Sequence, residues 1–158
     1  MDKTTFDIVV ICWIIMGCIT FPVQLFVTPP YGRHTTRKWG ITISNRVGWF
    51  LMEVPVLLIF YYFITTGQGD KNVVVWVIVS LFTLHYVHRA FIYPFRIHTK
   101  GKRMPLLIAL MAIFFNTMNG YINGYYLGSL QHTYDIAWLT DVRFITGTVL
   151  NIDGGLAI

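Results

Sequence analysis

The sequence has little charge and few cysteines. Only 12% of its 158 residues are charged, against about a quarter in ordinary soluble domains, and this excludes an ordinary soluble fold. The basic residues give a net charge of +5 but form no stripe of the kind that nucleic-acid-binding domains carry, so we expect no nucleic-acid partner. Cys12 and Cys18 lie six positions apart in one apolar segment. This spacing argues against a disulfide framework and suits no metal site.

Long apolar runs are abundant by contrast. The chain is 55% hydrophobic with a mean hydropathy of +0.59, and four segments reach the roughly 20 residues that a membrane-spanning helix needs. These segments are Phe6–Val27, Val47–Thr66, Val73–Phe95 and Met104–Leu130. Because backbone groups in lipid must be hydrogen-bonded internally, each segment must be helical. We therefore predict an all-α, polytopic membrane helix bundle with four transmembrane helices.

The distribution of basic residues predicts the orientation of this bundle. Eight of the 12 Lys and Arg residues lie after the first and third predicted spans, at positions 33, 37, 38, 46, 96, 100, 102 and 103. The positive-inside rule places both connections in the cytoplasm and the N-terminus on the opposite side. The connection between the second and third spans carries only Asp70 and Lys71, which fits an external position.

Glu53 is an isolated acid in the second predicted span. Trp49, Val56 and Phe60 share its helical face by their spacing, and Pro55 removes a backbone donor beside it. One interpretation is that Glu53 pairs with a positive residue on another helix and locks the bundle. The other is that it is a protonated or hydrogen-bonded acid in a binding cavity, and we favour this because ionisable residues inside membranes are usually functional.

The third predicted span carries the densest polar cluster. Tyr86, Arg89 and Tyr93 fall on one helical stripe. Arg89 has three possible partners: the membrane interface, which it would reach by snorkelling, a phosphate, or Glu53. His85 and His88 raise the possibility of a zinc ion bound together with Glu53, but too few ligands are present for a two-metal centre, and we predict no metal site.

The fourth predicted span has a stripe of amides and small residues. Its members are Asn116, Asn119, Gly120, Asn123 and Gly124. Such a stripe serves either close helix packing with amide cross-links or a wall that contacts a polar ligand, and the sequence favours neither.

Six stretches together resemble one known family. They are YGRH at 31–34, WFLMEVP at 49–55, LHYVHR at 84–89 followed by IYP at 92–94, MPLL at 104–107, NGY at 119–121 and TDVRF at 140–144. In this order and spacing they resemble the N-terminal half of the steroid 5-alpha-reductases, which implies the first part of a seven-helix fold. The family reduces the 4,5 double bond of 3-oxo-4-ene steroids with NADPH in the endoplasmic reticulum membrane.

The resemblance also implies roles for particular residues. Glu53 and Tyr86 match the pair that binds the steroid ketone. Since hydride addition to an enone drives negative charge onto the ketone oxygen, a protonated Glu53 and the Tyr86 phenol would act as its donors. Five further residues match positions near the cofactor or supporting it: Arg33, His34, Arg89, Tyr93 and Asn119. The family often has Gln before the motif Glu, where this chain has Met52.

The end of the chain departs from the family. We divide the sequence into a reductase-like membrane region, residues 1–143, and a short atypical tail, residues 144–158, which is too short for a fifth span. Residues 146–155 resemble the closing segment of short-chain dehydrogenases. We therefore expect a partial reductase that lacks most of its NADPH site, or alternatively a non-catalytic membrane protein that binds lipid or steroid. A transporter with Glu53 and Arg89 as relay groups is a third possibility.

Overall fold

The structure is a bundle of long helices with four candidate membrane spans, as the sequence predicts. It is a computed structural model that describes residues 2–27, 39–96, 101–130 and 134–146. Four helical stretches are long and apolar enough to cross a membrane: Lys3–Val23, Asn45–Thr66, Val73–Arg96 and Leu106–Leu130. The all-α membrane fold is thus confirmed, with boundaries within a few residues of the predicted spans.

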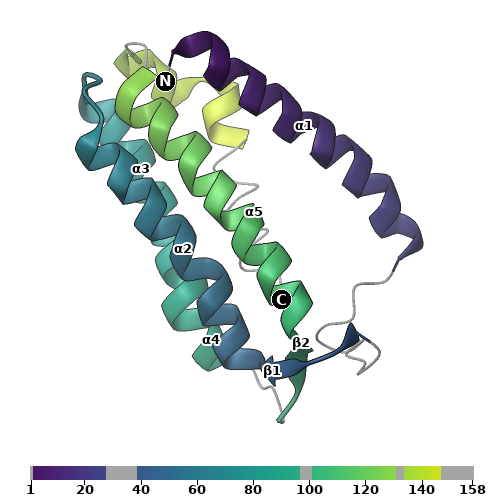
Figure 1. Ribbon diagram of the computed structural model, residues 1–158. Coiled ribbons are helices and arrows are strands. Elements are labelled where there is room, and N and C mark those ends of the chain that lie inside the picture. The colour runs from purple at the N-terminus through teal and green to yellow at the C-terminus, as the bar shows by residue number, and fades with distance from the viewer. Residues whose placement is uncertain (1, 28–38, 97–100, 131–133, 147–158) are drawn as a thin grey trace.

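The second, third and fourth spans form the body of the bundle (Figure 1). They consist of α2 (Asn45–Thr66), then α3 (Val73–Val87) continued by the π-helical segment η3 (His88–Ile92) and α4 (Tyr93–Arg96), and finally α5 (Leu106–Tyr125) continued by a second π-helical segment, η4 (Tyr126–Leu130). The most extensive packing is between α2 and α5. These helices carry most of the buried polar groups.

Glycines allow α2 and α5 to approach closely. A methyl group at Gly120 would lie 2.6 Å from the backbone oxygen of Val56, and one at Gly124 would lie 2.8 Å from that of Phe60. Small residues serve this purpose widely between membrane helices. The glycines of the fourth-span stripe are therefore packing residues, and the asparagines beside them have other partners.

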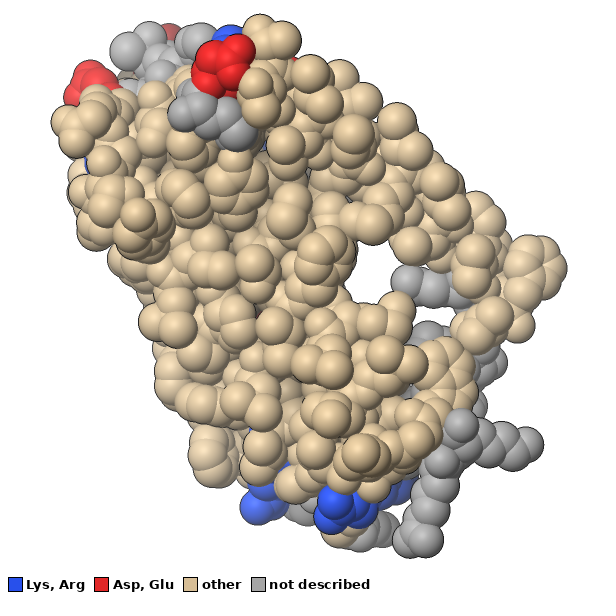
Figure 2. Space-filling view, viewed as in Figure 1, with Lys and Arg blue, Asp and Glu red and all other residues tan. Residues whose placement is uncertain are grey.

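Helix α1 (Lys3–Phe26) stands partly apart from this body. Its Phe6 is buried and stacks on Tyr125, with ring centroids 5.5 Å apart, and Trp13 contacts Phe115 at 5.3 Å. Only 6% of this span is buried, and the space-filling view shows an opening between α1 and the body (Figure 2). Most of its apolar surface therefore faces the surroundings of the bundle.

A two-stranded ribbon joins the connections at one end of the bundle. Strand β1 (Thr42–Ser44) pairs antiparallel with β2 (Arg103–Pro105), so that Ile43 lies opposite Met104. The predicted fourth span began at Met104, whereas the helix begins at Leu106. Met104 is buried and packs with Met52 and Ala109.

The opposite end is tied by a polar cap. The side chain of Asn72 accepts a hydrogen bond from the Val75 amide at 3.1 Å and donates to the Tyr134 carbonyl at 2.5 Å. This links the start of α3 to the chain before the 3-10 helix η5 (Ile136–Thr140). Residues 142–146 are helical, and the rest of the predicted tail, residues 147–158, lies outside the described residues.

Candidate functional site

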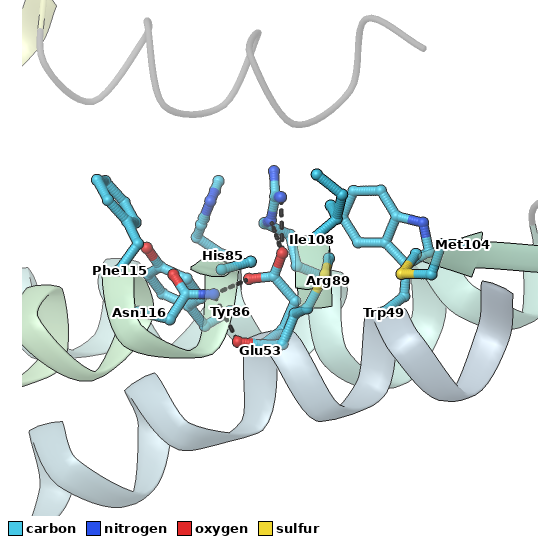
Figure 3. A pocket seen from close by; sticks show the side chains of 11 residues that line it. Trp49, Glu53, His85, Tyr86, Arg89, Met104, Ile108, Phe115 and Asn116 are labelled. Carbon is cyan, nitrogen blue, oxygen red and sulfur yellow. Dashed lines mark hydrogen bonds and ion pairs between the residues drawn. The ribbon is translucent and has the colours of Figure 1, made fainter. Parts of the chain in front are cut away.

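A cavity of about 370 Å³ lies between α2, the third span and α5 (Figure 3). Its lining contains both polar and apolar side chains. The polar lining residues are Glu53, His85, Tyr86, Arg89 and Asn116, and the apolar ones are Trp49, Met52, Met104, Ile108, Ala112 and Phe115. A cavity with this mixed lining is typical of small-molecule sites, where a few polar groups orient an apolar ligand.

Glu53 is the buried acid of this cavity, and Arg89 is its partner. The Glu53 side chain is 3% exposed, and its Oε1 accepts hydrogen bonds from Arg89 Nη2 at 2.7 Å and Nε at 3.1 Å. Of the three partners that the sequence left open for Arg89, the structure shows Glu53. As found, Glu53 accepts hydrogen bonds, whereas the role that we expected for it was that of a protonated donor.

The other carboxylate oxygen is held by α5. Asn116 Nδ2 donates to Glu53 Oε2 at 3.2 Å and to the Met52 carbonyl at 2.6 Å. Asn116 is buried, and its two donated bonds connect the α5 stripe to the acid (Figure 3). Our sequence-based site residues did not include Asn116. Its place one helical turn before Asn119, on the same stripe, was the signal that could have identified it.

Arg89 lies in the π-helical segment η3, which interrupts the third span beside the cavity. Single π turns inside α-helices are frequent at functional sites, since they change which side chains face a neighbouring helix. The Arg89 guanidinium carbon is 5.4 Å from the centre of the Trp49 ring, and the Tyr93 ring meets Trp49 edge-on at 4.9 Å. Arg89 and Tyr93 of the predicted stripe thus both contact Trp49 of α2.

Tyr86 is the second predicted ketone ligand, and its hydroxyl belongs to a chain of amides. Asn119 Nδ2 donates to Tyr86 Oη at 2.5 Å. Asn123 Nδ2 in turn donates to Asn119 Oδ1 at 2.8 Å. The Tyr86 ring is held by Phe82 at 4.7 Å.

The structure thus brings together five of the seven predicted site residues: Glu53, Tyr86, Arg89, Tyr93 and Asn119. Arg33 and His34 lie outside the described residues. No group of three or more His, Cys, Asp or Glu side chains that could hold a metal gathers within the described ranges. Of the two histidines that we considered as zinc ligands, His85 lines the cavity.

One motif of the resemblance lies away from the cavity. In TDVRF, Arg143 donates to both carboxylate oxygens of Asp141, at 2.9 and 2.8 Å, and its guanidinium lies over the Trp138 ring. The hydrogen bonds from Arg143 lower the pKa of Asp141 to about 2. This pair caps the region of η5, and neither residue lines the cavity of Glu53.

Fold and site together define a helical membrane protein with a buried charge pair and a tyrosine at a mixed cavity. Comparison with known proteins shows which family it resembles. A family model described as 3-oxo-5-alpha-steroid 4-dehydrogenase matches residues 102–157. Steroid 5-alpha-reductase DET2 of Gossypium hirsutum is 31% identical over 156 residues, 97% of this chain. The human 3-oxo-5-alpha-steroid 4-dehydrogenase 1 is 34% identical over 143 residues, 89% of this chain.

By sequence the chain is similar to the steroid 5-alpha-reductases over most of its length, and the resemblance drawn from its motifs is confirmed. The matches cover 60% of the cotton protein and 54% of the human one. The chain thus spans a little over half the length of these relatives.

Proposed function

We propose that this chain forms the ketone-binding part of a membrane reductase that acts on the 4,5 double bond of 3-oxo-4-ene steroids with NADPH. The proposal combines the names of the relatives with one observation, the cavity in which Tyr86 stands beside the Glu53–Arg89 pair. The endoplasmic reticulum membrane, where the resemblance puts this chemistry, is the compartment that we propose.

The apolar wall suits the carbon skeleton of a steroid. Ile108, Ala112 and Phe115 from α5 line the cavity together with the polar groups, and burial of apolar ligand surface against them stabilises binding by about 25 cal/mol per Å². A ligand with one polar end and an apolar body fits such a mixed lining. The ketone would lie at the Tyr86 side.

Tyr86 is the residue that we assign to the ketone oxygen. In enone reduction the new bond at the β carbon pushes an electron pair through the double bond onto that oxygen, which becomes an enolate. A hydroxyl aimed at the oxygen stabilises this charge, and such fixed donors contribute strongly where water is excluded. Glu53 supplies a second donor only in its protonated form, in which its interaction with Arg89 is no longer an ion pair.

The described lining does not fit a dinucleotide. Its cation is Arg89, which Glu53 already holds, and Tyr93 and Asn119 contact Trp49 and Tyr86. These three residues therefore support the ketone side of the site. Arg33 and His34 remain the cofactor-side residues that the resemblance implies.

Steroid binding to the full chain in lipid nanodiscs tests the proposal. We expect saturable binding of progesterone that is weakened about tenfold in Tyr86→Phe, the effect of one lost hydrogen bond, and unchanged in Tyr62→Phe, an exposed tyrosine of the same helix bundle. Absence of saturable binding in the parent chain would contradict the proposal.

Glu53→Gln separates the two forms of the acid. Glutamine keeps a neutral donor of similar shape. Steroid binding should therefore be preserved if the protonated acid binds the ketone, and it should be weakened if binding needs the carboxylate that pairs with Arg89. Adding NADPH and measuring the reduced steroid then tests whether this chain also catalyses the reaction. Binding without product formation would favour the alternative of a non-catalytic steroid-binding protein.

A further inference from the structure

The amides of α5 form a chain of hydrogen bonds with a fixed direction. Asn123 Nδ2 donates to the Asn119 backbone carbonyl at 2.9 Å and to Asn119 Oδ1 at 2.8 Å. Asn119 Nδ2 then donates to Tyr86 Oη at 2.5 Å. All three residues are partly buried.

The backbone carbonyl sets this direction. A carbonyl oxygen only accepts, so the atom of Asn123 that contacts it must be the NH₂ group. The same NH₂ group contacts the side chain of Asn119, whose nearer atom must therefore be its oxygen. The remaining atom of the Asn119 amide is consequently the nitrogen, and it donates to Tyr86.

This direction constrains the proton of Tyr86. A phenol oxygen that accepts from Asn119 cannot also donate to that nitrogen, because the NH₂ group of an amide has no acceptor capacity. The Tyr86 proton must therefore point away from the side-chain amide of Asn119. Because the Tyr86 side chain lines the cavity, the proton is available to a ligand there. Donation to Oη also polarises the O–H bond and strengthens the hydrogen bond that it makes in turn.

We propose that Asn119 and Asn123 are positioning residues that make Tyr86 a committed hydrogen-bond donor, and that they thereby select ligands with a carbonyl oxygen at this point. This inference rests on the proposed steroid site and assigns its preference for a ketone to two residues that do not touch the ligand. Asn116 fixes the neighbouring acid by the same logic, since its NH₂ group contacts the Met52 carbonyl and Glu53 Oε2.

The test compares the binding of two ligands to the full chain in nanodiscs. They are progesterone and its 3-deoxy analogue, which lacks the ketone oxygen at carbon 3. Asn119→Leu and Asn123→Leu keep the side-chain size and remove the amides, whereas Asn123→Gln keeps an amide. We expect the leucine variants to lower the affinity ratio of ketone to 3-deoxy steroid by about tenfold and the glutamine variant to restore most of it. A purely structural role would weaken both ligands equally and leave the ratio unchanged.

The state of the bound carbonyl gives a second measurement. With ¹³C at carbon 3 of progesterone, the infrared carbonyl stretch should lie at lower frequency in the parent chain than in Asn119→Leu or Tyr86→Phe. Equal frequencies in the parent and in Asn119→Leu would overturn the proposal.

A third measurement needs no steroid and separates this inference from the proposed function. The Raman doublet of tyrosine reports whether the phenol oxygen accepts or donates, and the parent spectrum minus that of Tyr86→Phe isolates Tyr86. We expect an acceptor signature in the parent that is lost in Asn119→Leu. If progesterone does not bind but this signature is present, the proposed function fails and the amide chain stands; an unchanged signature in Asn119→Leu refutes the amide chain itself.

Discussion

Glu53 and Arg89 depend on each other at the scale of single residues. Replacing Arg89 by Met leaves a buried acid without its cation, and removal of one partner of a buried pair typically costs about 3 kcal/mol. We expect Arg89→Met to lower the free energy of unfolding in detergent by this amount. Chemical denaturation followed by circular dichroism measures it.

The double variant provides the control for this prediction. Glu53→Gln together with Arg89→Met removes both charges, so it should recover much of the stability that Arg89→Met loses. If the two single changes simply add, the residues are not coupled.

At this scale the sequence singled out residues that the structure brings together, but it did not identify their partners. Glu53, Tyr86 and Arg89 were all expected at one site, and the structure places them around one cavity. The sequence left Glu53 as one of three possible partners of Arg89, and it did not predict the π turn at His88–Ile92 in which Arg89 lies. No residue pattern that we recognised predicts that turn. Asn116 was missed for a related reason: its contact with Glu53 crosses 63 positions of sequence and is visible only once α2 and α5 are packed.

At the scale of elements, the contact of α2 with α5 is the most sensitive to change. Gly120→Ala would place a methyl group against the Val56 backbone, where no side chain can move aside. Overpacking of this kind costs about 1 to 3 kcal/mol, so we expect a lower midpoint of thermal unfolding in detergent.

Gly17→Ala is the matched control, since a methyl group there meets nothing within 4 Å. Alanine is also the better helix former, by roughly 0.5–1 kcal/mol. The midpoint should therefore stay the same or rise slightly. A drop as large as that of Gly120→Ala would contradict the packing explanation, because a methyl group at Gly17 meets no neighbour.

Helices were predictable at this scale, and their irregularities were not. Apolar length alone located all four spans, because lipid leaves the backbone no other structure. The ribbon of β1 and β2 was not foreseen, since each strand has only three residues and pairs with a segment about 60 positions away. The asparagine stripe was ambiguous because one helix face serves packing and the site together.

At the scale of the whole molecule, charge is segregated between the two ends. Figure 2 shows most of the Lys and Arg surface at the end of α4 and the ribbon, and Asp and Glu at the other end. The described basic residues of the first end are Arg46, Arg96, Lys102 and Arg103. This distribution supports the predicted orientation, with the ribbon in the cytoplasm.

Cysteine labelling tests that orientation. In sealed endoplasmic reticulum vesicles, whose cytoplasmic face is outward, and in a chain whose Cys12 and Cys18 are replaced by serine, Lys102→Cys should react with a membrane-impermeant thiol reagent, and Asp70→Cys should react only after permeabilisation. Both positions are exposed, so accessibility within the protein does not distinguish them. The reverse labelling pattern would show that the orientation is opposite to the predicted one.

The ion pair between α2 and the third span, Val73–Arg96, also has a consequence for biosynthesis. A charged residue near the centre of a helix raises the free energy of membrane insertion by about 2.5–3.5 kcal/mol, and neither helix can neutralise its own charge alone. Only the short connection 67–72 separates α2 from α3, so the two helices can enter the bilayer as a hairpin in which acid and base already face each other. We expect a glycosylation-based insertion reporter to show that the hairpin inserts more completely than the third span, Val73–Arg96, alone, and that Glu53→Leu removes this advantage.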